Sequence, residues 1–547
     1  MRWVLDNIRP HKSYSITLNS IAEAALIGAR GNSGVIFAQF LYGLSRETIN
    51  KPIITISEFA ESVKRSIPYI YDAIANPVEG TILTIIKDWS DFLSNQKERF
   101  SDFKTLIINS LVMLEVSLKE TNKKLKALHN TDFVDAGAKG FFLFVKGMAD
   151  FVGSGIIPNL TFNKSEKIEL IHSENITEEV LEYRYCTEAI IKNTNANAPE
   201  LHKILSKWGD SAVVAGSDTV RRIHVHTNQP ALLFSDLKEI GTVTYQKVDD
   251  MVRQQELAFK RKWNIALVTD STCDLPKEIL DHYQITVVPL NLNFGDSHYL
   301  DKVTITPDQF YDLLESEPEF PKTSQINEQT ILNLYSHLAS HYDAIISIHL
   351  TSHFSGTFAN CVKAGKRIEK EFNVPVHVID SKNLSGALGL TVLDAAQRIE
   401  KGESMDSILN SIKIAIENTR IYVSVKDLKY MIKGGRVSKP KGMLASYLGL
   451  NPVISMDKDG KSTMFGKTFS QESSLKSIYK HIELLGRKHP ISNYIILHAH
   501  NSEGAERVEK KMIELTGIKP VSTVNISPVI GMHAGIGTVA ISLMFNN

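Results

Sequence analysis

Residues 264–275 read Asn-Ile-Ala-Leu-Val-Thr-Asp-Ser-Thr-Cys-Asp-Leu, so a short apolar run ends in a turn of polar side chains. The run has the residue types that favour a β-strand, and an amphipathic stretch with helical spacing follows it. This order recurs through the C-terminal half of the chain. Strands are expected at residues 264–269, 285–292, 344–350, 374–379, 421–425 and 494–498, and helices at 276–282, 327–340, 356–372 and 504–516. The alternation predicts an α/β fold with a largely parallel sheet covered by helices.

The N-terminal part of the chain has a helical period instead. Its apolar residues recur every three or four positions, and short glycine-bearing turns separate the segments, which is typical of an α-helical bundle. A small α/β module follows, with strands expected at residues 183–192 and 222–227 and a helix at 198–209. The predicted domains are a helical bundle (1–157), a polar linker (158–179), the small α/β module (180–262) and the larger α/β part (263–547).

Composition narrows the class of protein. The chain has 547 residues, which implies roughly three to four domains, and its 61 basic residues balance 61 acidic ones. This neutrality argues against a nucleic-acid partner. The three cysteines suggest no disulfide framework and the first residues form no signal sequence, so we expect a cytoplasmic protein. The uncharged stretch from 520 to 547 is broken by proline and glycines, so it predicts buried strands and loops and not a membrane span.

Three glycine-bearing turns stand out in the bundle. Residues 28–34 read Gly-Ala-Arg-Gly-Asn-Ser-Gly and would place backbone N–H groups at the start of a helix, where phosphate oxygens can bind. A tight turn with an Asn or Ser helix cap is the alternative. Similar turns are expected at 76–81 and 135–140, and three of them in one bundle favour a nucleotide site.

These turns resemble the nucleotide-binding helical (DhaL-like) domain shared by dihydroxyacetone kinases and the kinase component of bacterial fatty acid kinase. The resemblance covers most of residues 14–150 and implies ATP and Mg²⁺ as cofactors. The residues that it places near the nucleotide are Gly31, Asn32, Ser33, Gly34, Thr81, Asp135 and Gly137.

One feature of that family is missing. The family carries an acidic Asp-Gly-Asp-Thr-Gly loop ahead of the first turn, and its carboxylates hold the magnesium ions. Asp6 is the only acidic residue before Glu23, so the Mg²⁺ ligands are absent from this sequence. Phosphoryl transfer depends on metal ions to neutralise charge. We therefore expect either a fragment with a misplaced start or a chain that has lost kinase competence.

The predicted strands of the small module make a Cys/His cluster geometrically possible. His224 and His226 are two positions apart on a predicted strand and so point to one face, and Cys186 lies on the other predicted strand. Together they can form a zinc site, although two structural histidines would give the same spacing. Residues 183–188 and 209–227 resemble the middle domain of the same fatty acid kinase component. The resemblance implies that the three side chains are zinc ligands or catalytic participants in phosphoryl transfer.

Hydroxyl-rich turns end several predicted strands of the C-terminal half. They lie at residues 268–275, 322–325, 350–357 and 380–382. In a parallel sheet the carboxyl ends of strands meet at one edge, so these turns would supply uncharged donors to a carboxylate or phosphate. Serine and threonine are also ordinary helix caps, which makes any single turn uninformative.

Together with residues 433–438 and 531–535, these turns resemble the DegV family of fatty-acid-binding proteins across 264–547. The resemblance implies a two-lobed α/β fold with an acyl chain in an apolar slot between the lobes. It implies that Thr323, Ser355 and His533 hold the fatty-acid carboxylate. It also places Asp270, Ser271 and Arg436 near the same mouth.

The joined resemblances predict a fatty acid kinase fused to its own fatty-acid-binding domain. The γ-phosphoryl group of ATP would pass to the carboxylate of a long-chain fatty acid, and a membrane acyltransferase would accept the resulting acyl phosphate. A non-catalytic lipid carrier with a degenerate kinase scaffold is the alternative, and a dihydroxyacetone-type kinase is a second. Chain length of the fatty acid and a homodimeric state stay open.

Overall fold

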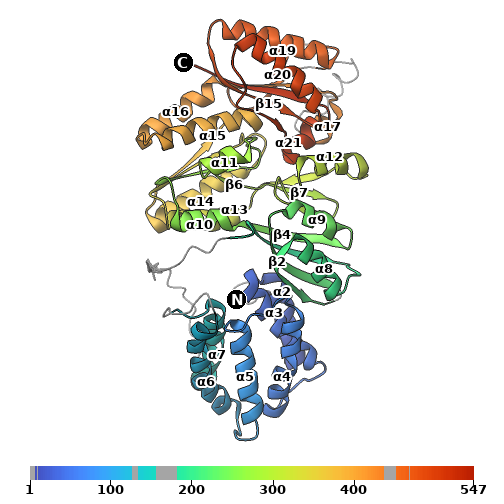
Figure 1. Ribbon diagram of the computed structural model, residues 1–547, viewed down its shortest axis with the longest axis vertical. Helices are drawn as coiled ribbons and strands as arrows, with labels where there is room; N and C mark the ends of the chain where they lie inside the picture. The colour runs from blue at the N-terminus through green and yellow to red at the C-terminus, as the bar shows by residue number, and fades with distance from the viewer. Residues whose placement is uncertain are drawn as a thin grey trace. The chain divides into compact units, whose positions relative to one another are not determined.

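The computed structural model (Figure 1) divides into two compact units, which are described separately. The first comprises Met1–Gln229 and Asp236–Asp249, and the second comprises Pro230–Ser235 and Asp250–Asn547. The expected linker, 158–179, and Arg436 lie outside the described residues. Those residues are 7–8, 10–125, 133–155, 181–217, 219–435, 451, 453–466 and 468–546.

The first unit begins with the helical bundle, coloured blue to teal in Figure 1. Its helices are α2 (Tyr14–Gly28), α3 (Gly31–Glu47), α4 (Ile56–Asp72), α5 (Ile82–Gln96), α6 (Phe103–Lys124) and α7 (Ala136–Ser154). Side-chain caps begin several of them: Asp102 accepts the N–H of Thr105 and Asp135 that of Ala138. The indole of Trp89 is buried in the core, where its ring meets aromatic neighbours edge to face. The predicted bundle is confirmed.

The small α/β module follows, and it belongs to the same unit except for Pro230–Ser235 and Asp250. Its elements are β1 (Tyr185–Lys192), α8 (Ala198–Trp208), β2 (Gly209–Gly216), β3 (Val220–Thr227), α9 (Pro230–Lys238) and β4 (Thr242–Asp250). The sheet order is β2-β3-β1-β4, and β1 pairs antiparallel with β3 so that Cys186 lies opposite His226 and Glu188 opposite His224. The end of α4 bonds to β2, since Val214 donates its N–H to the carbonyl of Ala73 at 2.8 Å. Module and bundle therefore share backbone hydrogen bonds.

The second unit opens with a parallel sheet in the order β11-β10-β5-β6. Its first lobe contains α10 (Met251–Phe259), β5 (Ile265–Asp270), α11 (Lys277–His282), β6 (Thr286–Val288), β7 (Asn291–Phe294), β8 (Ser297–Leu300), α12 (Pro307–Ser316), β9 (Lys322–Ser324), α13 (Glu328–Ala339), β10 (Ala344–His349), α14 (Thr357–Phe372) and β11 (Val376–Asp380). β7 pairs with β8 and β9 in a separate three-stranded sheet. The predicted strand at 285–292 is two strands, because Pro289 lies between β6 and β7 and has no N–H for a ladder.

The second lobe holds a six-stranded sheet in the order β14-β13-β12-β17-β15-β16. Its elements are α15 (Ser385–Glu400), α16 (Met405–Asn418), β12 (Thr419–Ser424), α17 (Lys429–Lys433), β13 (Val453–Met456), β14 (Ser462–Phe465), α19 (Gln471–Gly486), β15 (Ile491–His498), α20 (Ser502–Thr516), β16 (Ser522–Asn525), α21 (Pro528–Ala534) and β17 (Val539–Phe545). Only the pair β15 and β16 is parallel here, so the expected parallel sheet belongs to the first lobe.

The multidomain fold class is thereby confirmed: helical bundle, small α/β module, and a larger α/β part containing a parallel sheet. The final segment, predicted as strands and loops, also contains α21, which starts at a Ser527 cap followed by Pro528. No helix among the described residues has the length and apolar character that a membrane crossing requires.

Candidate functional site

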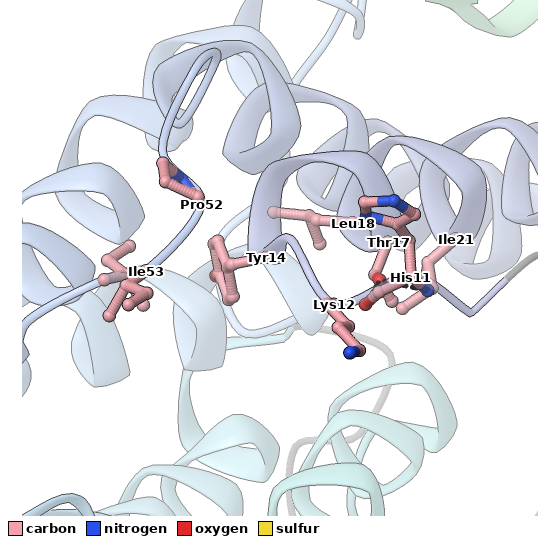
Figure 2. Close-up of a pocket in the computed structure, with 9 residues that line it drawn as sticks. His11, Lys12, Tyr14, Thr17, Leu18, Ile21, Pro52 and Ile53 are labelled. Atoms are coloured by element: carbon pink, nitrogen blue, oxygen red, sulfur yellow. Dashed lines mark hydrogen bonds between the residues drawn. The ribbon is translucent and has the colours of Figure 1, made fainter.

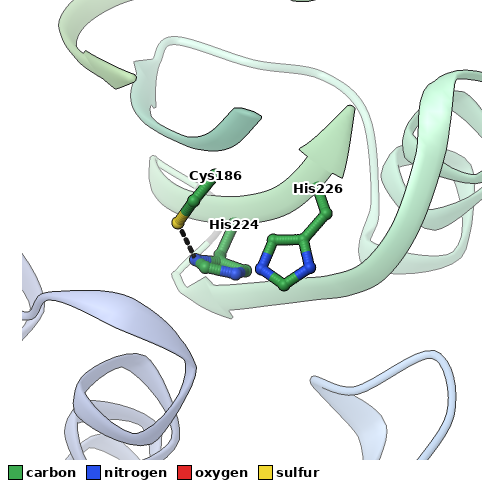
Figure 3. Close-up of side chains that lie close together, drawn as sticks. All are labelled: Cys186, His224 and His226. Atoms are coloured by element: carbon green, nitrogen blue, oxygen red, sulfur yellow. Dashed lines mark hydrogen bonds between the residues drawn. The ribbon is translucent and has the colours of Figure 1, made fainter. Parts of the chain in front are cut away.

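The Cys/His cluster of the small module forms as the strand spacing predicts. Figure 3 shows the sulfur of Cys186 directed at the ring of His224, with the ring of His226 beside it. Cys186 Sγ lies 3.9 Å from His224 Nδ1, and the two imidazole centroids are 5.1 Å apart. One ligand atom from each residue lies within 4.8 Å of the others, and this is the one such group among the described residues. The geometry therefore brings all three predicted residues together.

The chemistry of the cluster fits a zinc ion. His224 is 1% exposed, and its Nε2 has no hydrogen-bond partner within the described structure. Burial lowers the pKa of His226, with the neighbouring His224 adding to it, which favours a neutral, metal-binding imidazole. Burial raises the pKa of the Cys186 thiol to about 12, so the thiol would lose its proton as the metal binds. Thiolate and imidazole are the preferred ligands of zinc, and three protein ligands would leave a fourth position open.

Glu188, a residue that sequence reasoning missed, lies beside this cluster. One carboxylate oxygen accepts the backbone N–H of Gly31 at 2.6 Å, and the other accepts the guanidinium of Arg222 at 2.5 Å. The oxygen that accepts the Gly31 N–H lies 4.0 Å from His224 Nδ1. Burial alone would raise the pKa of Glu188, but the bond with His224, the charge of Arg222 and the Gly31 N–H lower it to about 2. The carboxylate is therefore ionised.

Two of the predicted nucleotide turns meet in the bundle. A Cβ atom on Gly137 would overlap the hydroxyl of Ser33, so the turn that starts α7 lies directly against the turn that starts α3. Asp135 caps α7 by accepting the N–H of Ala138 at 2.7 Å. Gly31 has a positive φ of 63°, a conformation that glycine adopts without strain. The start of α7, at Asp135 and Gly137, therefore lies against Ser33 in the turn formed by residues 31–34.

The third turn is held by local contacts. Thr81 caps α5 by accepting the N–H of Leu83 at 3.4 Å, and its hydroxyl donates to the carbonyl of Val78. Gly80 has a φ of 84°, and a Cβ there would lie 2.7 Å from the backbone nitrogen of Leu125. The turn therefore packs against the end of α6.

The structure places Thr323 and Ser355 on neighbouring segments of the first lobe. Thr323 lies in β9, and Gln325 follows it by two residues. A Cβ on Gly356, the residue after Ser355, would overlap the side chain of Gln325. The N–H of Ile326 also donates to the hydroxyl of Thr357 at 3.4 Å. The two predicted carboxylate ligands thus come from adjoining segments.

His533 approaches from the second lobe. It lies in α21, where a Cβ on Gly434 would overlap its Nδ1, so α21 packs against the turn that follows α17. At the end of α17, the ammonium of Lys433 lies 5.7 Å from the ring centroid of Phe320. The end of α17 and the residue after it therefore lie close to Phe320 and to His533.

Asp270 and Ser271 lie in the interior of the second unit. Asp270 is fully buried and accepts bonds from the N–H of Leu350 and from His349 Nδ1, both at 3.0 Å. The hydroxyl of Ser271 donates to Asp301 at 2.6 Å. Both side chains are therefore buried and hydrogen-bonded within the second unit.

A separate surface hollow of about 440 Å³ lies at the start of α2 (Figure 2). None of the predicted site residues contributes to it. Its lining is His11, Lys12, Tyr14, Thr17, Leu18, Ile21, Pro52, Ile53 and Ile54.

Comparison with known families matches three models in chain order. A DAK2 domain matches residues 2–150, a FakA-like middle domain of the fatty acid kinase type matches 182–258, and the DegV family matches 264–546.

Relatives match the C-terminal part. A DegV domain-containing protein of Staphylococcus aureus (strain MRSA252) is 31% identical over 278 residues, which is 51% of this chain and 98% of the relative. Protein DegV of Bacillus subtilis (strain 168) is 30% identical over 283 residues, 52% of this chain and 99% of the relative.

Two solved structures are similar over the same part. DegV from Bacillus subtilis, described as a fatty acid binding protein, is 30% identical with a TM-score of 0.48. A fatty acid binding DegV family protein from Streptococcus agalactiae is 26% identical with a TM-score of 0.48. Each similarity covers 52% of this chain and 100% of the other. The chain therefore belongs to the DegV family, and a DAK2 domain and a FakA-like middle domain precede its DegV domain.

Proposed function

We propose that the protein binds a long-chain fatty acid in its DegV domain and that its first unit phosphorylates the bound carboxylate with ATP. The observation that carries this proposal is the presence of all three domain types in one chain. Membership of the DegV family, together with the position of Thr323 and Ser355 on adjoining segments, supports the first half of the proposal. The meeting of two glycine turns beside the Cys/His cluster supports the second half.

In this proposal Thr323, Ser355 and His533 hold the fatty-acid head group. Two hydroxyls and an imidazole can donate hydrogen bonds to one carboxylate oxygen and leave the other free to attack phosphorus. The attacking oxygen forms a bond to the γ-phosphorus of ATP, the bond from that phosphorus to the bridging oxygen breaks, and ADP leaves. The product is an acyl phosphate. The protein contributes chiefly position and electrostatic stabilisation.

The residues at the glycine turns do not form a magnesium site. Glu79 already accepts the hydroxyls of Tyr71 at 3.0 Å and Thr84 at 2.5 Å, and Asp135 caps α7. Paired carboxylates are the usual protein ligands of Mg²⁺ at a phosphoryl-transfer site, and the described turns offer none that is unengaged. The proposed reaction therefore relies on no magnesium ion held by these side chains.

Zinc is the metal that the chain's own residues suit. Cys186, His224 and His226 would hold it, and when bound it would supply a Lewis acid and a local positive charge beside the glycine turn. Metal analysis of the purified protein tests this assignment. One zinc per chain is expected, with little in Cys186→Ser and a full complement in Cys273→Ser, whose thiol is buried outside the cluster.

The kinase half is tested by incubating the protein with ATP, magnesium and oleate and trapping acyl phosphate with hydroxylamine. A fatty hydroxamate detected by mass spectrometry is expected, and His226→Ala should reduce it. Fatty acid that binds without yielding hydroxamate would instead support the lipid-carrier alternative. Phosphorylation of dihydroxyacetone in the same assay, with none of oleate, would favour the sugar-kinase alternative.

A further inference from the structure

The carboxylate of Glu188 lies next to both the proposed metal cluster and the proposed phosphate-binding turn. On β1 it follows Cys186 by two positions, so both side chains project from the same face of the strand. One of its oxygens is 4.0 Å from His224 Nδ1 and 2.6 Å from the backbone nitrogen of Gly31. The side chain is 1% exposed. A single buried charge therefore contacts the proposed metal cluster and the first residue of the proposed phosphate turn.

Arg222 completes the arrangement from β3. Its guanidinium donates to the carbonyl oxygens of Leu26 at 3.2 Å and Ile27 at 3.0 Å, which lie at the end of α2, and to Glu188 at 2.5 Å. A cation at the carboxyl end of one helix and an anion at the amino end of the next both complement the helix dipoles. The ion pair thus holds the turn between α2 and α3 at its two ends.

This position gives Glu188 an effect on anion binding. The amino end of α3 is where phosphate oxygens would bind, and the carboxylate already occupies its first N–H. Its negative charge repels an approaching phosphate. A divalent cation on the cluster attracts the same carboxylate at short range and offsets that repulsion.

We propose that Glu188 couples the two sites, so that a metal ion on Cys186, His224 and His226 tightens nucleotide binding at the turn formed by residues 31–34. This inference rests on the proposed function, because it assumes nucleotide at that turn. Linkage makes the effect reciprocal: nucleotide tightens metal binding by the same factor. Glu188 is a positioning residue here and not a catalytic one.

Hydrogen exchange tests the structural half without any nucleotide. Zinc should speed amide exchange in peptides covering 28–34, because the cation draws the carboxylate toward His224 and releases the Gly31 N–H. In Glu188→Gln the zinc response should be lost, while Glu200→Gln, a carboxyl-to-amide change at the cap of α8, should respond as the wild type does. An unchanged zinc response in Glu188→Gln overturns the proposal, whether or not the protein is a kinase.

Ligand affinities test the functional half. In the wild type, zinc should tighten ATP binding about tenfold, and ATP should tighten zinc binding by the same factor. Glu188→Gln should bind both ligands with a coupling factor near one, and in the zinc-free state it should bind ATP more tightly than the zinc-free wild type. Coupling that persists in this variant overturns the inference. Absence of ATP binding by the wild type, with the exchange response intact, overturns the nucleotide half of the proposed function.

Removing one partner of a buried ion pair can prevent folding. The double variant Glu188→Gln/Arg222→Met removes both charges with little change in volume and should fold as the wild type does. It should show the same loss of zinc response and of coupling. Wild-type coupling in the folded double variant contradicts the proposal.

Discussion

The carboxylate of Asp301 accepts a hydrogen bond from the backbone N–H of Val529, 3.3 Å away, although the two residues belong to different lobes of the second unit. Beside it, Asp274 accepts the N–H of Ser527 at 3.1 Å and pairs with the ammonium of Lys302 at 2.5 Å. Buried carboxylates therefore hold the amino end of α21, the helix that carries His533. The position of the predicted histidine therefore depends on Asp274 and Asp301 of the first lobe.

Asp301 should make stability depend on pH. Burial raises its pKa to about 7, against the opposing charge of Lys302. Because this is above the unfolded value of 3.8, the stabilising contribution is complete below about pH 4 and is lost as pH rises to 7. In Asp301→Asn, urea unfolding of the DegV domain should lose this part of its pH dependence between pH 4 and 7.5. The exposed carboxylate variant Asp312→Asn is the control, and an equal slope in Asp301→Asn and wild type would refute the assignment.

Substitutions at the proposed carboxylate ligands should weaken fatty-acid binding without unfolding the protein. Ser355→Ala and His533→Ala each remove a donor to a charged group, worth about 1.5–3 kcal/mol, or roughly ten- to a hundredfold in Kd. Titration with a fluorescent fatty acid measures this, with thermal unfolding as the check on folding. Ser352→Ala is the matched control, since Ser352 is exposed in the same turn. Wild-type affinity in the Ser355/His533 double variant would rule out these ligands.

Much of the architecture could be predicted from local patterns in the sequence. The helical period of the bundle and the strand–helix alternation after residue 263 predicted the fold class, and the i, i+2 spacing of His224 and His226 predicted the cluster with Cys186. The helical period and the histidine spacing each lie within one element, where side-chain direction follows from the period. The approach of Cys186 on β1 to the histidines on β3 depends on how the two strands pair.

Contacts between residues of different elements left no comparable pattern in the sequence. Glu188 meets Gly31 across 157 positions, and Asp301 meets Val529 across 228. Nothing in the neighbouring residues distinguishes these acids from solvated ones, because burial is decided by tertiary packing. A clue was present in the case of Glu188, which shares the face of Cys186 on the strand.

The contact between Ser33 and Gly137 gives a test of the proposed nucleotide turn. In Gly137→Ala the new methyl group would overlap the Ser33 hydroxyl and displace the start of α3, so ATP affinity should fall at least tenfold. Gly140→Ala, three residues later in α7, meets nothing within 4 Å and should be neutral or stabilising by up to about 1 kcal/mol. Calorimetric titration with ATP and thermal unfolding of both variants provide the comparison. Equal ATP affinity in the two variants would show that ATP does not bind at this turn.

The pair formed by His349 and Asp270 should oppose alkaline unfolding. Burial alone would lower the pKa of His349, but the interactions with Cys361 and Asp270 raise it to about 10, and the pKa of Asp270 is lowered. The imidazolium contribution is therefore complete below pH 6.5 and is lost as pH rises through 10. Asp270→Asn leaves a buried cation without its partner, which should cost about 3–5 kcal/mol at pH 7.

That cost should shrink above pH 6.5, because the unfolded chain then loses the His349 proton while the folded wild type keeps it, so the contribution of the pair declines toward pH 10. Urea unfolding of the second unit at pH 7 and pH 9.5 measures both values. Glu400→Gln breaks the exposed pair with His282 and should change stability by less than about 1 kcal/mol at either pH. If Asp270→Asn were no more destabilising than Glu400→Gln at pH 7, the buried histidine would have to be neutral in the folded protein.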